Sequence, residues 1–448
     1  KKLIRRSWPY VSKYQSSQCF IFKVRDLLDK SGVIALISIS SNFQNELSID
    51  FRRRFIATFS IRYLINISNV KDITFGEQSE PAVILIYTNK VSKNKINVYS
   101  LEPSVFSQIT KILVDKKEDE NGQIAEEILE NNLNWTPYVL GYSDYLSTID
   151  RIYKNSTPLD RYAKDCQVGV MKHSYEKHGD KENFYAKFFS DFPKEGYYPL
   201  VDSIKNIENY KKPEISRYVD YKNANLDRQR NLELFKGKKL VITRSWPLKV
   251  FVDEDLVIYD GNFIIFNIKK EFEDYLKFFN YLLTSKLAYF YFSVLRLQRD
   301  KGNFQKINKS SILHFPVPHI DKKLLELVEK CKSSEQIDQL IYHAYNFEYK
   351  YVQEIEDFYR TSTEKYTLVT KEDIVQYIDE FESIYQSLIE NNKNLNFKFY
   401  FSDFIGSILQ IIITNEKQPF EFNTIRYDKL IGLIVKRNII NKKIIREY

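Results

Sequence analysis

Apolar and polar positions near the start of the chain predict elements in the order α-β-α-β-β. Apolar residues over 17–30 recur at helical spacing, with Ser17 at the position of an N-cap and Gly32 at that of a C-cap. Val33–Ile39 is then a nearly continuous apolar run, typical of a strand that is covered on both faces. A basic helix over 51–56 and strands over 61–67 and 82–87 complete the order.

The run Val33–Ile39 also predicts that this strand has neighbours on both sides. At the edge of a small sheet its backbone groups would be unpaired, and both apolar faces would contact water. We therefore expect further strands, either from a segment that precedes the chain or from a second polypeptide. The alternative is an independent small α/β domain with an open edge.

Downstream, the pattern predicts a charged helical connector over 101–132, followed over 135–318 by an aromatic-rich region in which strands alternate with short helices. Two consecutive helices are predicted over 275–283 and 285–297. The segment 321–359 has two apolar stripes at helical spacing and predicts further helices. A last unit begins with a capping pattern at Thr370, continues as a helix, and includes strands over 397–401 and 408–414.

Composition indicates a folded protein with more than one domain, since 43% of the 448 residues are hydrophobic and 28% are charged. The net charge of +8 is moderate, so a polyanion would have to bind a local basic patch.

Cys19, Cys166 and Cys331 are far apart, which argues against a zinc site or a disulfide framework and favours a reducing cytoplasm. No apolar run approaches the roughly 20 residues that a membrane helix needs, so no membrane partner is expected.

Sequence motifs for nucleotide, metal and nuclease chemistry are absent. The 12 glycines form neither G-x-G-x-x-G nor G-x-x-x-x-G-K-[ST], so no phosphate-binding loop is predicted. None of the 5 histidines stands in an H-E-x-x-H frame, and the carboxylates form no recognisable nuclease cluster. We therefore predict no catalytic residue and no metal ligand in this chain.

Positive charge is concentrated between Lys205 and Lys249, where 12 Lys or Arg residues stand against 5 Asp or Glu residues. Such a segment is either an ordinary solvated face or a surface that neutralises phosphates of nucleic acid. Basic and aromatic residues also interleave over 237–318, and planar or bidentate side chains, Tyr259 included, suit base edges. The predicted DNA-binding residues are Lys172, Arg217, Tyr218, Lys238, Lys239, Arg244, Trp246, Arg296, Arg299 and Lys301.

Several short motifs follow one another after residue 150. They are LDRYAKDCQVGVM over 159–171, FKGKKLVITRSW over 235–246, YLLTSK over 281–286, the exit LHFPVP over 313–318, and IDQLIY over 337–342. Together with the N-terminal α-β-α-β-β order, this series resembles the downstream portion of a gamma-class N6-adenine DNA methyltransferase with a fused target-recognition domain, as in type IIG and related restriction–modification enzymes. The resemblance extends over roughly residues 15–360.

The resemblance implies an α/β fold class in five parts. It places the C-terminal half of a Rossmann-like methyltransferase sheet over 1–105, a helical connector over 106–150, an α+β target-recognition domain over 151–320, a helical extension over 321–362 and a small C-terminal α+β unit of unknown role over 363–448. Strands 61–67 and 82–87 resemble the terminal antiparallel pair of the methyltransferase sheet. Between them, Phe75 falls where the family places an aromatic ring against the extruded adenine. The alternative for Phe75 is a core phenylalanine at a strand end.

The resemblance implies sequence-specific recognition of double-stranded DNA within an S-adenosylmethionine-dependent N6-adenine DNA methyltransferase of restriction–modification or phage defence. In that family a Gly-rich loop binds the cofactor and an Asn-Pro-Pro-Tyr loop orients the adenine, and this sequence contains neither. We therefore expect the catalytic half to lie upstream or on a partner chain, and we expect no methyl transfer by this chain alone. The alternative is a non-catalytic DNA-binding specificity subunit of a multisubunit defence complex.

Overall fold

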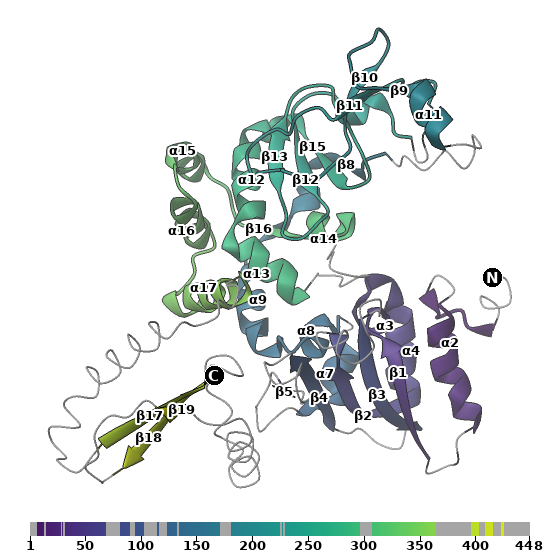
Figure 1. The fold of residues 1–448 in the computed structure, drawn as a ribbon, viewed down its shortest axis with the longest axis vertical. Helices are drawn as coiled ribbons and strands as arrows, with labels where there is room; N and C mark the ends of the chain where they lie inside the picture. Colours follow the sequence, from purple (N-terminus) through teal and green to yellow (C-terminus); the bar gives the residue numbers. More distant parts are fainter. Residues whose placement is uncertain are drawn as a thin grey trace. The chain divides into compact units, whose positions relative to one another are not determined.

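The computed structural model describes residues 7–12, 15–27, 29, 32–68, 81–89, 95–102, 114–115, 123–131, 134–170, 181–224, 226, 229–295, 307–363, 396–402, 408–414 and 423–424 (Figure 1). The chain divides into two compact units. The first comprises Lys1–Ser100 and Asn121–Thr363, and the second comprises Leu101–Glu120 and Glu364–Tyr448. The fold is mixed α/β, with several small sheets. The five-part division predicted from the sequence stays a prediction.

The first unit begins with a sheet whose strands run in the order β1-β3-β2-β4, with β6 on β4. These strands are β1 (Val33–Ile39), β2 (Phe59–Asn66), β3 (Ala82–Asn89), β4 (Lys95–Glu102) and β6 (Gln123–Ala125). β3 is antiparallel to both β1 and β2, and β4 is parallel to β2. The predicted order of elements and the predicted antiparallel pair are therefore confirmed. We call this the N-terminal sheet.

One face of the N-terminal sheet packs against helices. These are α2 (Ser16–Lys23), α3 (Ser41–Gln44), α4 (Ile49–Thr58), α7 (Glu126–Asn131) and α8 (Thr136–Val139). Aromatic rings fill the contact: Phe55 lies 5.3 Å from Tyr87, and Phe43 stacks on Trp135 at 6.0 Å. All four of these side chains are fully buried. Aromatic pairs at these distances add attraction beyond the area that they bury, so this face holds the core of the sheet.

The opposite face of the N-terminal sheet carries apolar side chains that belong to no core cluster. The strand register places Ile37 beside Ile84, and Ile84 beside Ile65. Ile37 is 60% exposed, Val33 48% and Tyr63 38%. Within the described residues, β1 pairs only with β3 and stands at the edge of the sheet. Within the described residues β1 is therefore an edge strand, because β3 inserts between β1 and β2. The further strands that the sequence predicts, from a preceding segment or a second polypeptide, stay a prediction.

The first helix is shorter than the sequence pattern predicts. It ends at Lys23, and the 3-10 turn η2 (Val24–Leu27) follows. Ser17 is not its cap, since the residue before the helix is Gln15 and the Ser17 hydroxyl accepts a hydrogen bond from Asn42 Nδ2 at 3.1 Å. Phe20 is 58% exposed and Leu27 85%. A buried polar side chain, Gln18, orients the helix instead by donating to Asn42 Oδ1 at 3.1 Å and to Ser48 Oγ at 2.9 Å.

The described part of the predicted connector is not one helix. It contains the end of β4, the strands β5 (Val114–Asp115) and β6, and then α7 and α8. β6 lies antiparallel to β4, so residues 123–125 of the predicted helical connector are paired as a strand. Short helical turns η5 (Ser143–Tyr145) and α9 (Leu146–Tyr153) lead to the next domain.

The domain that follows is built around a four-stranded antiparallel sheet in the order β13-β12-β15-β8 (Figure 1). The strands are β8 (Ala163–Val168), β12 (Lys239–Thr243), β13 (Val250–Asp253) and β15 (Phe263–Ile268). Alternate residues belong to two different cores: Leu240 and Ile242 face one core, whereas Val241 faces the other. Because both faces are covered, β12, β13 and β15 are buried at nearly every position, whereas of the edge strand β8 only Cys166 is buried. We call this the central sheet.

A smaller layer covers one face of the central sheet. It contains a four-stranded sheet in the order β14-β10-β11-β9 with helix α11 beside it. Its elements are α11 (Lys181–Phe188), β9 (Phe189–Ser190), β10 (Tyr198–Val201), β11 (Arg217–Val219), η7 (Leu232–Phe235) and β14 (Ile258–Tyr259). Gly169 lies where the two layers meet. A Cβ atom at this position would lie 2.2 Å from the carbonyl oxygens of Tyr259 and Asp260. The backbone approaches so closely at this point that only glycine fits.

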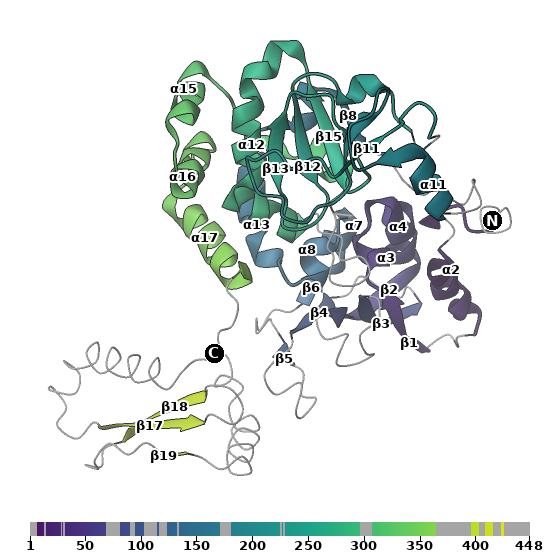
Figure 2. The ribbon, with the colours of Figure 1, turned by 45° about the horizontal axis from the view of Figure 1, so that its top comes forward.

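Helices cover the other face of the central sheet (Figure 2). The helices next to the sheet are η6 (Leu159–Tyr162), η8 (Lys270–Tyr275), α12 (Leu276–Thr284), α13 (Lys286–Leu295) and α14 (Lys309–Leu313). An outer layer of α15 (Lys322–Lys330), α16 (Ser334–Ala344) and α17 (Tyr349–Thr363) packs against α12 and α13. The two predicted helices over 275–283 and 285–297 are confirmed. The entry and exit of the domain meet where β7 (Thr157–Pro158) pairs with β16 (Pro316–Val317).

The start of α13 explains the Thr-Ser-Lys motif. Ser285 Oγ accepts from the Ala288 backbone N–H at 3.2 Å, and Asp338 Oδ1 accepts from the Lys286 N–H at 2.9 Å. Lys286 Nζ pairs with Glu356 at 2.6 Å. Capping by Ser285 and Asp338 satisfies N–H groups that would otherwise lack partners, and it links α13 to α16 and α17.

The second unit contains a three-stranded sheet in the order β18-β17-β19. Its strands are β17 (Asn396–Ser402), β18 (Ile408–Thr414) and β19 (Asn423–Thr424). The predicted strands over 397–401 and 408–414 are therefore confirmed. β5 also belongs to this unit and pairs with Leu101 and Glu102 at the end of β4. The helix predicted from Thr370 lies outside the described residues.

Candidate nucleic-acid interface

The residues that the sequence predicts to bind DNA fall into two groups in the structure. Phe75, Lys172, Arg296, Arg299 and Lys301 lie outside the described residues, so their roles stay predictions. The remaining members belong to the central sheet and to the layer that covers it. These are Arg217, Tyr218, Lys238, Lys239, Arg244 and Trp246.

Lys239 does not belong to a DNA-binding surface. It lies opposite Asp253 on the neighbouring strand, and the two fully buried side chains form an ion pair of 3.0 Å. Tyr259, also fully buried, donates its hydroxyl hydrogen to Asp253 at 2.9 Å. Lys212 Nζ lies 2.9 Å from the other oxygen of the same carboxylate. The predictions for Lys239 and Tyr259 are therefore wrong, because both side chains stabilise a buried carboxylate beneath the surface.

Burial and charge oppose each other in this network. Burial lowers the pKa of Lys239, and the nearby Asp253 carboxylate only partly restores it. Burial alone would raise the pKa of Asp253, but the hydrogen bond from Lys212 and the charge of Lys239 outweigh it and hold this pKa below its usual value. A buried carboxylate thus stays ionised because two ammonium groups and one hydroxyl face it.

Arg217 and Tyr218 occupy adjacent positions on β11. Arg217 Nε lies 3.3 Å from Asp202, and its guanidinium carbon is 5.7 Å from the centre of the Tyr185 ring. Both β11 side chains are half-buried. Arg217 therefore already has an acidic and an aromatic partner within its own layer.

Arg244 and Trp246 follow the end of β12. Arg244 donates from Nη1 to the Gly261 carbonyl oxygen at 3.0 Å. The Trp246 ring lies 4.8 Å from that of Tyr289 and 6.2 Å from that of Phe292, on helix α13. Both residues are half-buried, so this arrangement orients their side chains and leaves part of each accessible. Their contact with DNA stays a prediction.

Lys238 is the predicted DNA-binding residue with the clearest solvent access. Its side chain is 44% exposed, and Nζ lies 3.4 Å from Glu254, an ordinary surface pair. Gly237, next to it, has a φ of +70°, a conformation that favours glycine over other residues. The turn places the exposed lysines Lys236 and Lys238 on either side of this glycine, just before β12 begins.

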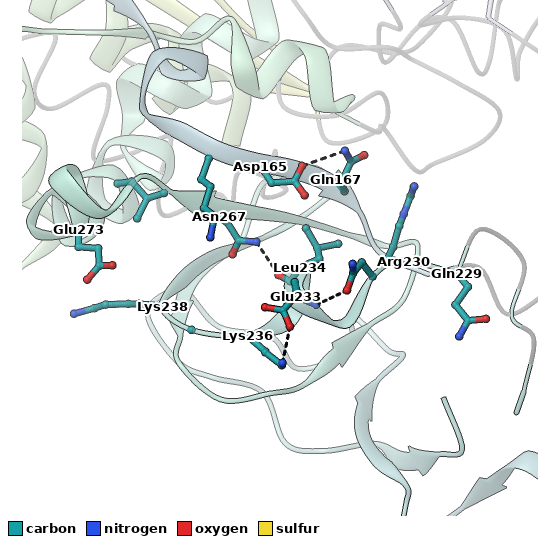
Figure 3. A pocket seen from close by; sticks show the side chains of 14 residues that line it. Asp165, Gln167, Gln229, Arg230, Glu233, Leu234, Lys236, Lys238, Asn267 and Glu273 are labelled. Carbon is teal, nitrogen blue, oxygen red and sulfur yellow. Dashed lines mark hydrogen bonds and ion pairs between the residues drawn. The ribbon is translucent and has the colours of Figure 1, made fainter. Parts of the chain in front are cut away.

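A polar pocket lies beside this turn (Figure 3). Its volume is about 480 Å³, within the range of pockets that hold small ligands or parts of larger ones. Its lining comes from β8, from the segment 229–238, from the last two residues of β15 and from Glu273 in η8. The lining residues are Lys164, Asp165, Gln167, Gln229, Arg230, Asn231, Glu233, Leu234, Lys236, Gly237, Lys238, Asn267, Ile268 and Glu273. All of them except Leu234, Gly237 and Ile268 have side chains that form hydrogen bonds.

Comparison with known proteins gives partial structural likenesses. No protein-family model matches the sequence. No curated protein matches it. The type IIG restriction endonuclease BpuSI is similar with a TM-score of 0.34 and 14% identity, over 76% of this chain and 48% of that chain. The type IIL restriction–modification enzyme MmeI in complex with DNA is similar with a TM-score of 0.44 and 10% identity, over 76% of this chain and 51% of that chain. The DrdV–DNA complex is similar with a TM-score of 0.40 and 12% identity, over 73% of this chain and 41% of that chain.

The chain thus spans about half the length of the first two of these proteins. At these identities and TM-scores the likeness does not extend to function.

The pocket adds residues that the sequence predictions did not select as site residues. Gln229, Arg230 and Asn231 are consecutive, and the only signal for them is their place within the basic segment Lys205–Lys249. Within the part of the chain that the structure describes, no group of His, Cys, Asp and Glu residues is arranged to hold a metal ion. Over the same residues, no helix is long and apolar enough to span a bilayer.

Proposed function

We propose that this chain recognises a sequence in double-stranded DNA as part of an S-adenosylmethionine-dependent N6-adenine DNA methyltransferase of restriction–modification or phage defence. Its catalytic half docks on the N-terminal sheet, either as a preceding segment or as a partner chain. The observation that carries the proposal is the unpaired edge of β1, together with the exposed apolar face behind it.

The edge of β1 supports docking by strand addition. A strand beside β1 would pair backbone N–H and C=O groups that no described strand pairs. A helical layer carried with that strand would cover Val33, Ile37 and Tyr63, which are large apolar side chains in contact with water. Exposed apolar patches of this kind mark interaction surfaces. The order β1-β3-β2, with β3 antiparallel to both neighbours, fits the end of the methyltransferase sheet that the sequence resembles.

Exposed lysines support DNA as the partner of the domain that is built around the central sheet. They lie in the basic segment and include Lys205, Lys211, Lys222, Lys236 and Lys238. Each lysine that contacts a phosphate releases counterions, so binding should weaken steeply as salt rises. Phosphate contacts orient the duplex, and the sequence is read by side chains that reach base edges.

The residues of this chain do not fit S-adenosylmethionine. The sequence has no Gly-rich cofactor loop. The end of β1, where a cofactor would be expected in an α/β sheet, is filled by the chain's own polar side chains. Asn42 there donates to Ser38 Oγ at 3.0 Å and accepts from Gln18. We therefore assign no step of methyl transfer to this chain; its part is to bind and orient DNA.

The proposal is tested by reconstitution. The chain is mixed with the Asn-Pro-Pro-Tyr-containing polypeptide encoded immediately upstream of it, with methyl-labelled S-adenosylmethionine and with duplex DNA. We expect label in N6-methyladenine at one short sequence with the mixture and none with this chain alone. Salt-dependent duplex binding by the chain alone, with no methylation by the mixture, would instead favour the alternative, a non-catalytic specificity subunit.

A matched pair of variants connects this test to the sheet. Ile37→Lys places a charge on the exposed apolar face, and Tyr349→Lys places one at a side chain that is 75% exposed on α17. We expect Ile37→Lys to abolish association with the catalytic half and Tyr349→Lys to preserve it. Association of the Ile37→Lys protein at wild-type strength would contradict docking on this sheet.

A further inference from the structure

We infer that the polar pocket between β8 and the segment 229–238 reads base edges of duplex DNA, with Arg230 as the residue that determines the preferred base at one position. This inference rests on the proposed function and goes further, because it assigns base reading to Arg230, which the sequence analysis places only within the basic segment Lys205–Lys249. Figure 3 shows Gln229 and Arg230 on one side of the pocket and Lys236 and Lys238 on the other.

Arg230 is held in place before any ligand binds. Its backbone N–H donates to the Tyr221 hydroxyl at 2.9 Å, and that hydroxyl donates to the Arg230 carbonyl oxygen at 2.7 Å. Its side-chain Nε donates to the Val168 carbonyl oxygen at 3.0 Å, at the end of β8. Gln229 Nε2 fixes the neighbouring residue by donating to the Tyr221 carbonyl oxygen at 2.6 Å. Burial raises the pKa of Tyr221 to about 12, so its hydroxyl remains a donor across the physiological range.

These contacts leave the planar end of Arg230 available. Neither terminal nitrogen has a hydrogen-bond partner or a carboxylate within the described residues, and the side chain is half-buried. A guanidinium group presents two parallel N–H donors, which match the N7 and O6 acceptors of guanine in the major groove. Because Nε is already bonded to Val168, little side-chain entropy remains to be lost on binding.

The rest of the lining can form hydrogen bonds with base edges. Gln167, Gln229 and Asn231 have amide groups that can donate and accept, as adenine requires. Asp165, Glu233 and Glu273 line the pocket together with Lys164, Lys236 and Lys238, so the lining carries both signs of charge. A carboxylate can accept from the amino group of cytosine, and the exposed Lys238 can contact a phosphate beside the bases.

No aromatic ring occurs among these lining residues. An extruded base is ordinarily held between flat side chains. The lining therefore suits base edges that remain within the duplex.

The test is selection of a preferred site from a random duplex library by the full chain, followed by binding measurements on that site and on its single-base-pair variants. Three variants are compared. Arg230→Ala removes the guanidinium group, and Arg230→Lys keeps the positive charge but lacks the two parallel N–H donors. Arg360→Ala removes an exposed arginine that pairs with Asp357 on α17.

We expect Arg230→Ala and Arg230→Lys to lose discrimination at one base pair by roughly tenfold to a hundredfold. Both variants should discriminate normally at the other positions, and Arg360→Ala should match the wild type. Two results would overturn the inference. One is unchanged discrimination in Arg230→Ala. The other is weaker binding to every sequence, with a salt slope reduced by about 0.9, the value expected for the loss of one phosphate contact. Absence of any salt-dependent duplex binding by the wild-type chain would instead remove the proposed function itself.

Discussion

Replacing Lys239 with alanine should destabilise the fold without removing a DNA contact. The Lys239 and Asp253 side chains are both fully buried, and their ion pair is 3.0 Å long. Lys239 Nζ also donates to the carbonyl oxygen of Asp255 at 2.6 Å and to that of Gly237 at 3.3 Å. The variant leaves the carboxylate and both carbonyl groups with fewer donors beneath the central sheet.

The size of the destabilisation by Lys239→Ala depends on the partners that Asp253 keeps. Removing one partner of a buried ion pair costs about 3–5 kcal/mol, because the other charge stays out of water. Lys212 at 2.9 Å and the Tyr259 hydroxyl at 2.9 Å still face the carboxylate. We therefore expect the lower end, about 3 kcal/mol. At about 2–4 °C per kcal/mol for a large domain, Tm should fall by roughly 6–12 °C.

Lys238→Ala is the matched control, because the Lys238 side chain is 44% exposed and pairs with Glu254 at the surface. Thermal unfolding is followed by circular dichroism, and duplex binding is measured over a range of salt at a temperature where both variants are folded. Lys239→Ala should lower Tm and leave the salt dependence unchanged. Lys238→Ala should change Tm little and reduce the salt slope by about 0.9, the value of one phosphate contact. A Lys239→Ala protein with wild-type Tm and a reduced salt slope would refute the reasoning.

Two further predictions concern stability. Burial raises the pKa of Asp338 to about 6, above its ordinary value of 3.8, so its stabilising contribution is complete below about pH 4 and is lost as pH rises through 6. In Asp338→Asn the side-chain oxygen can still accept a hydrogen bond from the Lys286 N–H, but the side chain carries no charge. It should raise the free energy of unfolding at pH 8 by up to about 3 kcal/mol and flatten its pH dependence between pH 4 and 6. Urea unfolding at pH 5 and 8 measures this, and a less stable variant at pH 8 would contradict it. Gly169→Ala should cost about 3 kcal/mol or more, because its Cβ would lie 2.2 Å from two carbonyl oxygens. Gly196→Ala, with a φ of +79° in open space, should cost only about 1 kcal/mol in the same thermal melts.

Local patterns in the sequence determined most of the elements. The apolar run Val33–Ile39 is a strand, the segments after it fold as helix, strand and strand, and the helices around Ser285 begin where the motif indicates. These predictions succeed because periodicity and capping act between residues that are close along the chain.

Tertiary structure alone decided which charged residues reach the solvent and which stay buried. Lys238 and Lys239 are adjacent and chemically identical, yet one is exposed and the other fully buried, because Lys238 lies in the turn before β12 whereas Lys239 is the first residue of that strand, which is covered on both faces. The grouping of Arg230 with Gln167 of β8 depends on segments far apart in sequence. The open edge of β1 likewise follows from the insertion of β3 beside it. Pairing between distant strands is set by the packing of the whole sheet, and no local pattern contains it.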